Sequence, residues 1–367
     1  MSRTEQLEAA PVPGRLSVLD RYLAVWIGVA MAGGLLLGRV VPQLAEVIDT
    51  VTIGSVSLPI ALGLLIMMFP VLAKVRYDEV GSVARDRRML ALSLALNWLV
   101  GPAVMFTLAW LFLADLPEYR TGLIIVGLAR CIAMVIIWND LADGDREAAA
   151  VLVAINALFQ VLAFALLGWF YLDLLPGWLG LSGAALDISP WRIAGSVGIF
   201  LGIPLAAGYL ARRLGESRWG REAYEERFLP AIGPWALYGL LFTIVVLFAL
   251  QGEAITDKPF DVARIAIPLV LYFAVMWGGS MVAAHRLGLG YRRATSVAFT
   301  AAGNNFELAI AVAIAVFGLS SPQALAGVVG PLIEVPILVG LVYVSLWSRR
   351  FFPNPFTPLK DGYEARR

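Results

Sequence analysis

The sequence predicts an all-α integral membrane protein with ten transmembrane helices. Hydrophobic residues make up 60% of the 367 residues and charged residues only 15%, and the mean hydropathy is +0.79, whereas a soluble domain of this length is more polar. Apolar runs of about 18 or more residues contain almost no charge, which is long enough to cross roughly 30 Å of hydrocarbon as helices. The runs are continuous, whereas the strands of a barrel would alternate apolar and polar positions.

The predicted elements follow one another with short polar connections. In chain order, the ten spans cover residues 22–40, 57–73, 89–113, 121–138, 148–172, 193–211, 228–250, 265–285, 294–318 and 324–347. Residues 1–20 are polar and precede a span that is too long for a signal peptide, so we expect them to form an uncleaved N-terminal tail. Residues 349–367 are expected to form a C-terminal tail.

Basic residues collect on one side of the predicted membrane. Most lysines and arginines lie in the tails and in alternate loops, and the opposite side has only Arg39, Arg120, Arg192, Lys258 and Arg264. Because short cytoplasmic loops carry the excess of Lys and Arg, both termini are predicted to be cytoplasmic. The even number of spans agrees with this orientation.

Ten spans divide into two groups of five, residues 21–175 and 176–348. Because five is odd, the second group enters the membrane from the side opposite to the first. This is the geometry of an inverted repeat, in which substrate sites lie near the middle of the membrane.

Polar groups inside two spans are the first candidates for function. Arg130 and Cys131 lie in the fourth span, and Asn304, Asn305 and Glu307 lie in the ninth. These two spans are the fourth of each half, and interrupted helices at corresponding positions indicate a transporter's binding site. A charge in a membrane span is costly unless it faces a partner or a watery cavity, so these side chains predict a path for a substrate or for protons.

The ninth span contains poor helix sequence at Gly303, Asn304 and Asn305, which predicts local unwinding. The two asparagines would then offer amide ligands to a solute or to Na⁺, or they would cap the backbone at the break. Asn97 in the third span is a further substrate-binding candidate, although hydrogen bonding between helices is the commoner use of such a residue.

Several motifs along nearly the whole chain match one known family. They are GLARCIAMVIIWNDLA from Gly127, Asn97-Trp98, Gly101-Pro102, GNNFELAIAVAIAVFG from Gly303, and Glu334-Val335-Pro336. In these motifs the chain resembles the arsenical-resistance-3 family of arsenite exporters, of the superfamily that includes the bile-acid sodium symporters. The resemblance implies two inverted five-helix repeats with broken, crossed fourth and ninth helices. It also implies that Cys131 and Glu307 are the functional residues.

The chemistry of a lone thiol suits this substrate. Trivalent arsenic is soft and thiophilic, and a thiolate is a soft ligand. One S–As contact can exchange, whereas three would hold As(III) almost irreversibly, so we expect Cys131 to be the ligand of As(III) as substrate. The alternative is that Cys131 is a small buried hydrophobe. Arg130 would contact the substrate or form an ion pair with Glu334 or Glu307.

Two carboxyl groups are candidates for proton coupling. Glu307 would bind and release a proton as the cavity changes access, or it would merely balance the charge of Arg130. Glu334 precedes Pro336 in the tenth span. It would support the proton route, or it would have a pairing role at a helix kink.

Enzyme and ATP-driven functions lack their motifs. None of the three lysines follows a glycine, so the chain has no GK[ST] phosphate loop. The only histidine, His285, excludes an HExxH zinc site. We therefore expect neither catalysis nor a cofactor, and no nucleic-acid partner.

Together these features predict a secondary active transporter in a bacterial cell membrane. It would extrude arsenite, with antimonite as a further candidate, from the cytoplasm in exchange for protons. The main alternative is a sodium-coupled importer of an organic anion on the same fold, with Arg130 holding the anion. A membrane scaffold or sensor that binds the metalloid without moving it is a third reading. Sodium-independent, proton-dependent export would separate the three.

Overall fold

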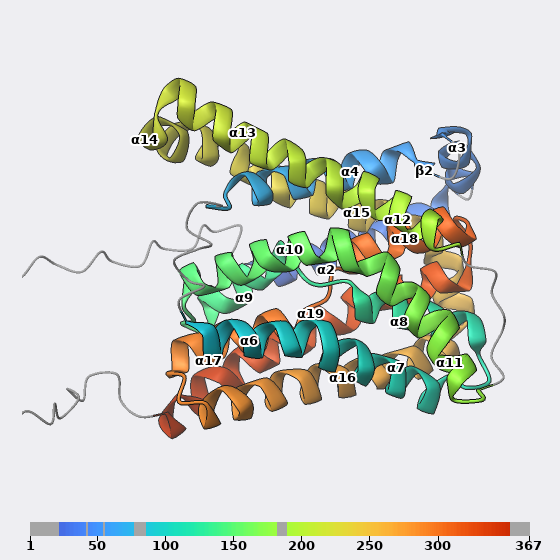
Figure 1. Cartoon of the computed structure of the whole chain (residues 1–367). Helices are drawn as coiled ribbons and strands as arrows, with labels where there is room; N and C mark the ends of the chain where they lie inside the picture. Colours follow the sequence, from blue (N-terminus) through green and yellow to red (C-terminus); the bar gives the residue numbers. More distant parts are fainter. Residues whose placement is uncertain (1–21, 42, 54–55, 77–85, 182–188, 353–367) are drawn as a thin grey trace, which may run out of the picture.

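The computed structural model describes residues 22–41, 43–53, 56–76, 86–181 and 189–352 (Figure 1). These residues are helical apart from connecting loops and a hairpin in which two-residue strands pair antiparallel. The N-terminal tail predicted over 1–20 lies outside the described residues, as does most of the C-terminal tail predicted over 349–367.

The elements of the first half are α2 (Leu23–Val40), α3 (Leu44–Thr50), β1 (Thr52–Ile53), β2 (Val56–Ser57), α4 (Leu58–Ala73), α6 (Arg87–Ala95), α7 (Gly101–Phe112), α8 (Pro117–Leu128), α9 (Met134–Leu141), α10 (Arg146–Trp169) and α11 (Leu175–Trp178). Those of the second half are α12 (Pro190–Val197), α13 (Ile203–Trp219), α14 (Arg221–Ala223), α15 (Leu229–Asp257), α16 (Pro259–Arg286), α17 (Tyr291–Ala302), α18 (Phe306–Phe317) and α19 (Pro322–Ser348).

Seven helices of the described part are long and apolar enough to cross a membrane. Four of them are composite, because π-helical turns join α6 to α7, α10 to α11, α12 to α13 and α14 to α15. The helices at 190–219 and 221–257 extend well beyond the apolar runs predicted at 193–211 and 228–250. Their polar ends continue the helix past the apolar stretch that hydropathy detects.

The other three predicted spans are shorter or divided. The span predicted at 57–73 is α4, which has 16 residues. The span predicted at 121–138 is divided into α8 and α9, and the span predicted at 294–318 is divided into α17 and α18. The spans predicted at 121–138 and 294–318 are therefore broken, as the family resemblance implies for both and the sequence at Gly303 predicts for the second.

The long helices pack into two groups. Helices α2, α4 and α13 pack with α15 or with one another, and we call this group the α15 bundle. The broken segments pack with α7, α10, α16 and α19, and we call this group the break bundle. Figure 1 shows α4, α13 and α15 as one layer and α7, α16 and α17 on the far side of the break bundle, with α14 and the end of α13 projecting from one end.

Close packing of α2 against α15 explains two glycines of the first span. A Cβ atom built on Gly34 would lie 2.6 Å from the carbonyl oxygen of Val245 and 2.7 Å from Cβ of Phe248. A Cβ on Gly38 would collide with the carbonyl oxygen of Ala249. Small residues here let the two backbones approach, as in other membrane helix pairs.

We expect Gly38→Ala to lower the free energy of unfolding by about 1–3 kcal/mol, because the added methyl forces α2 away from α15. Gly33→Ala is the matched control, since a Cβ there meets no atom within 4 Å. This control should be neutral or stabilising by up to about 1 kcal/mol, because alanine is the better helix former. Thermal unfolding of the purified variants in detergent measures both changes. Equal effects of the two substitutions would contradict the packing explanation.

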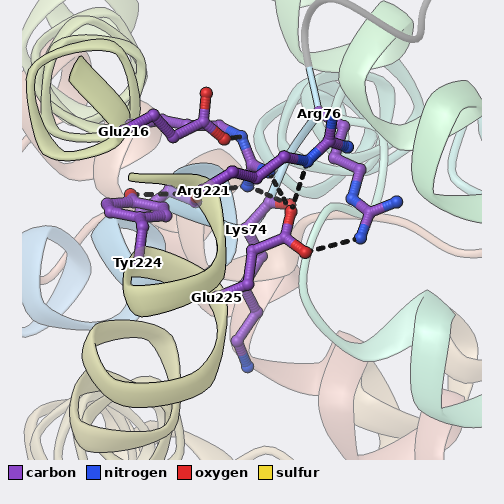
Figure 2. Close-up of polar contacts among 8 residues, drawn as sticks. Lys74, Arg76, Glu216, Arg221, Tyr224 and Glu225 are labelled. Carbon is purple, nitrogen blue, oxygen red and sulfur yellow. Dashed lines mark hydrogen bonds and ion pairs between the residues drawn. The ribbon is translucent and has the colours of Figure 1, made fainter. Parts of the chain in front are cut away.

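The end of α4 is joined to α13 and to the start of the α14–α15 helix (Figure 2). The buried Arg212 of α13 donates from Nη1 to the carbonyl oxygens of Ala73 and Lys74, at 3.4 and 3.2 Å. The Tyr224 hydroxyl donates to the Ala73 carbonyl oxygen at 3.2 Å. These bonds satisfy carbonyl groups that an α-helix leaves unpaired at its C-terminus.

Glu225 forms ion pairs with three arginines around this helix end. Its carboxylate lies 2.7 Å from Arg76 Nη2, 2.6 Å from Arg212 Nη2 and 3.3 Å from Arg221 Nε. Burial favours the neutral carboxyl, but the hydrogen bonds from Arg76 and Arg212 outweigh it and hold the pKa of Glu225 below its ordinary value. The cluster connects three helices of the α15 bundle at one end.

Further ion pairs lie near the ends of the break bundle. Arg293, at the start of α17 before the second break, pairs with Asp86 at 2.9 Å, and Arg349 after α19 pairs with Asp143 at 3.1 Å. At the other end of the composite helix formed by α6 and α7, Asp115 accepts a hydrogen bond from Arg264 Nη1, near the start of α16, at 2.9 Å. These ion pairs thus lie at the helix ends.

Candidate functional site

Two broken helices meet in the middle of the break bundle. Helix α8 ends at Leu128 and α9 begins at Met134, and the backbone at Ala129 is extended. Helix α17 ends at Ala302, and the backbone at Gly303 is also extended. Glycine followed by two asparagines favours an interruption in the second case, because glycine loosens the helix and asparagine competes for its hydrogen bonds.

The two breaks are paired through their main chains. Arg130 and Asn304 form an isolated antiparallel bridge. The Cys131 N–H donates to the Gly303 carbonyl at 3.2 Å, and the Asn305 N–H donates to the Ala129 carbonyl at 3.1 Å. Backbone groups that leave a helix inside a membrane need partners within the protein, and here each break supplies them to the other.

Asn304 and Asn305 cap helix ends where the two breaks meet. Asn304 Nδ2 donates to the carbonyl oxygens of Val126 and Ala129, at 2.9 and 3.1 Å. Asn305 Oδ1 accepts from the Leu308 N–H at 3.0 Å and is the N-cap of α18. The capping role considered for both residues is therefore present. Asn304 Oδ1 and Asn305 Nδ2 are buried and have no hydrogen-bond partner among the described residues, so each side chain keeps one group available for a ligand.

Cys131 and Glu307 face one small cavity between the two bundles. Its lining residues are Met67 and Met68 of α4, Cys131, Ile132, Ala133 and Met134 of the first break, Leu240 of α15, and Asn305 and Glu307 of the second break. The cavity volume is about 10 Å³, which is room for about one water molecule. Cys131 is 3% exposed, so this conformation is closed around the thiol.

The carboxyl groups of Glu307 and Glu334 are both buried and incompletely paired. Glu307 Oε1 and Glu334 Oε2 have no hydrogen-bond partner among the described atoms. Glu334 Oε1 accepts from the Asn304 N–H at 3.3 Å, which connects α19 to the second break. Pro336 lies within α19, which continues to Ser348. The thiol of Cys131 and the carboxyl groups of Glu307 and Glu334 thus lie near the place where the two breaks meet.

Arg130 is placed differently from its neighbour Cys131. Its side chain is fully buried, and Nη1 donates to the Tyr272 hydroxyl at 2.8 Å while Nη2 donates to the Gly127 carbonyl. A Cβ built on Gly101 of α7 would lie 2.8 Å from Nη1, so the guanidinium lies against α7 and α16. In the described part of the chain Arg130 forms no ion pair with Glu307 or Glu334, and it does not line the cavity. Its Nε is buried and has no hydrogen-bond partner within the described part of the chain.

Asn97 lies on the π-helical turn between α6 and α7. Its Nδ2 donates to the carbonyl and hydroxyl oxygens of Ser93 at 2.8 and 3.2 Å, and Oδ1 is unpaired. Gln160 of α10 accepts from the backbone N–H of Arg130. The neighbouring Trp98 donates to Asn156 of α10 at 3.2 Å. Gln160 and Asn156 thus join α10 to neighbouring segments, whereas Asn97 bonds within its own composite helix and is not among the cavity-lining residues.

The electrostatics of the cavity follow from the helix ends that border it. Met134 begins α9, and Asn305 and Glu307 lie at the start of α18. The backbone amides of Met134 and Val135 contact the Cys131 thiol. Helix N-termini carry partial positive charge, which offsets part of the cost of burying the Cys131 thiol and the Glu307 carboxyl group there. The cavity thus presents a soft sulfur and an oxygen donor to a soft, oxygen-bearing solute.

Sequence reasoning did not identify the opposite wall of the cavity. Met67, Met68 and Leu240 come from the α15 bundle and are apolar residues in apolar spans, so no pattern distinguishes them. Tyr272, which contacts Arg130, was also missed. A tyrosine hydroxyl in the middle of a span requires a hydrogen-bond partner, and this requirement could have indicated from the sequence that Tyr272 contacts a polar residue.

Comparison with known proteins identifies the family of this chain. Residues 61–258 match the family model described as the Sodium Bile acid symporter family. The chain is 58% identical over 352 residues to the arsenical-resistance protein Acr3 of Corynebacterium glutamicum, covering 96% of this chain and 95% of the relative. The chain belongs to the arsenical-resistance-3 family.

Other relatives are more distant. The arsenical-resistance protein Acr3 of Alkaliphilus metalliredigens is 30% identical, with 92% of this chain and 95% of the relative covered. An uncharacterized transporter of Synechocystis sp. is 34% identical, covering 95% of this chain and 93% of the relative. Membership of the arsenical-resistance-3 family, within the bile-acid symporter superfamily, confirms the prediction from motifs. Together with the apolar helices it identifies a multi-pass membrane protein.

Proposed function

We propose that this chain is a secondary active transporter that extrudes trivalent arsenite from the cytoplasm in exchange for protons. Its relatives named as arsenical-resistance proteins support arsenite as the substrate. The observation that carries the proposal is the closed cavity in which one thiol and one carboxyl, Cys131 and Glu307, face the α15 bundle. Antimonite, which is also trivalent and thiophilic, is the second substrate that we propose.

The cavity must enlarge for transport, because about 10 Å³ is too small for a hydroxylated arsenic atom. The wall formed by Met67, Met68 and Leu240 belongs to the α15 bundle, and the thiol and carboxyl belong to the break bundle. Relative movement of the two bundles would therefore open the cavity to one side of the membrane and then to the other. In this cycle Cys131 binds the solute, and Glu307, supported by Glu334, exchanges a proton.

We infer that the chain crosses the membrane ten times as two inverted repeats, residues 21–175 and 176–348. The two broken segments support this topology because each is fourth in its half and they pair antiparallel. The basic ends of α4, α13 and α19 support cytoplasmic termini in a bacterial cell membrane. The protein would then act on solutes that reach the cavity from the cytoplasm.

The alternative of a sodium-coupled importer of an organic anion is not favoured by the site. Such an importer would use Arg130 to hold the anion, yet its guanidinium lies against Tyr272 and Gly101 and not in the cavity. The cavity instead presents the sulfur of Cys131, which is a soft ligand with little affinity for a hard cation such as Na⁺. Transport of a thiophilic solute that binds the Cys131 sulfur fits these contacts better than transport of an organic anion. We propose no catalytic role for the protein.

In everted membrane vesicles that contain the protein, we expect arsenite uptake when the lumen is made acidic relative to the outside. Outward proton flow would then drive arsenite inward, from the face that was cytoplasmic. Uptake should be abolished by a protonophore and should be unchanged when sodium is replaced by potassium. Antimonite should compete with arsenite.

Vesicles without the protein are the control for passive entry. No uptake from correctly folded protein would exclude arsenite export. Uptake that requires sodium and does not depend on the proton gradient would favour the sodium-coupled mechanism. Binding of arsenite without any flux would favour a sensor.

A further inference from the structure

A second, larger groove lies on the outer face of the α15 bundle, away from the Cys131 cavity. It has a volume of about 500 Å³ and only apolar lining residues. Among them are Leu65, Phe69 and Pro70 of α4, Ala207 of α13, and Ile232 and Trp235 of α15. Trp235 is 55% exposed, so the groove opens to the surface that faces lipid in a membrane-spanning bundle. Its size and chemistry suit a hydrocarbon chain.

A cation lies at one end of this groove. Lys74 is one helical turn beyond Pro70, and its side chain is exposed. A Cβ built on Gly233 would lie 3.4 Å from Lys74 Nζ, and Gly233 follows Ile232, which lines the groove. Figure 2 shows the Lys74 side chain extending away from the Glu225 carboxylate. The ammonium group therefore lies where α15 and the groove meet.

The helix ends around Lys74 add to this positive charge. The helix ends around Lys74, residues 74–76 and 212–227, contain seven lysines or arginines and four glutamates. This part of the described chain is therefore net positive. Exposed tryptophans, Trp219 and Trp235, flank this region, as is typical of residues at the membrane–water interface.

We propose that this groove binds one anionic glycerophospholipid, with an acyl chain between α4, α13 and α15 and the phosphate beside Lys74. The apolar groove alone would accept any lipid chain, but the adjoining net positive charge selects an anionic headgroup, as other basic pockets between membrane helices do. The bound lipid would hold the basic end of the α15 bundle at the membrane surface. This site is independent of the arsenite cavity and of the transport direction.

The test is native mass spectrometry of the purified full-length chain with equimolar phosphatidylglycerol and phosphatidylcholine. We expect one phosphatidylglycerol molecule to stay bound in preference to phosphatidylcholine. Ala207→Trp fills the groove and should remove this molecule, whereas Ala274→Trp on the exposed face of α16 should not. Lys74→Gln should reduce the preference for phosphatidylglycerol about fivefold, and Lys74→Arg should keep it.

A second measurement does not depend on the groove-filling variant. Phosphatidylglycerol with brominated acyl chains should quench tryptophan fluorescence more in the parent than in Trp235→Phe, and brominated phosphatidylcholine should show a smaller difference. Lys258→Gln, at the opposite end of α15, is the charge control and should not change lipid preference. Equal binding of both lipids by the parent, or retention of phosphatidylglycerol by folded Ala207→Trp, would overturn the proposal.

Discussion

Replacing Cys131 with serine is expected to reduce gradient-driven arsenite uptake to the level of vesicles without the protein. Serine has nearly the same shape as cysteine, so the closed cavity and the hydrogen bond from residue 131 to Gly303 can remain. Its hydroxyl is a hard ligand with little affinity for soft As(III). Because the chain has one cysteine, no other thiol can replace it. Uptake into everted vesicles at matched protein levels measures the loss.

Ala133→Ser is the matched control, because it adds a hydroxyl to the same cavity and keeps the thiol. It should retain most of the uptake. The lone cysteine also permits a direct test, since a maleimide can label this chain only at Cys131. Arsenite should slow that labelling. Full uptake by Cys131→Ser, or labelling that arsenite does not slow, would remove the thiol from the mechanism.

Glu307→Gln is expected to uncouple arsenite movement from the proton gradient. Glutamine keeps the shape of the side chain beside the cavity but cannot bind and release a proton at the working pH. Accumulation under an imposed gradient should fall to the level seen without a gradient. Exchange of external labelled arsenite for arsenite loaded inside the vesicles should continue, because the Cys131 thiol is unchanged.

Two further substitutions define the control for this result. Glu334→Gln keeps an acceptor for the Asn304 N–H, so the break should retain its geometry and accumulation should fall only in part. Glu253→Gln, an exposed residue of α15, should behave like the parent. Normal gradient-driven accumulation by Glu307→Gln would show that the proton is carried elsewhere.

The sequence predicted the helical membrane class and the second interruption because each depends on local composition. Long apolar runs mark the spans, and the succession of Gly303, Asn304 and Asn305 marks the second break. The first break has no glycine or proline between Ala129 and Ala133. The polarity of Arg130 and Cys131 marked this segment as a candidate site, and its interruption was implied by the resemblance to the arsenical-resistance-3 family.

Other features depend on contacts between distant segments. The main-chain bridge between the two breaks joins residues 174 positions apart, as Arg130 and Asn304 show, and no local pattern encodes it. The direction of the Arg130 side chain follows from the extended backbone, in which neighbouring side chains point to opposite faces. Met67 and Met68 resemble any apolar residue until α4 is placed beside the crossing.

The bridge between the breaks has a mechanical consequence. Its hydrogen bonds join backbone atoms of residues 129–131 to those of residues 303–305, so side-chain substitution leaves the donors and acceptors in place. In the transport cycle proposed above, we therefore expect these two segments to move together and to carry the thiol and the carboxyl with them. The distance between these groups would stay constant through the cycle, and the barrier to transport would arise where apolar surfaces of α4 and α15 slide past these two segments.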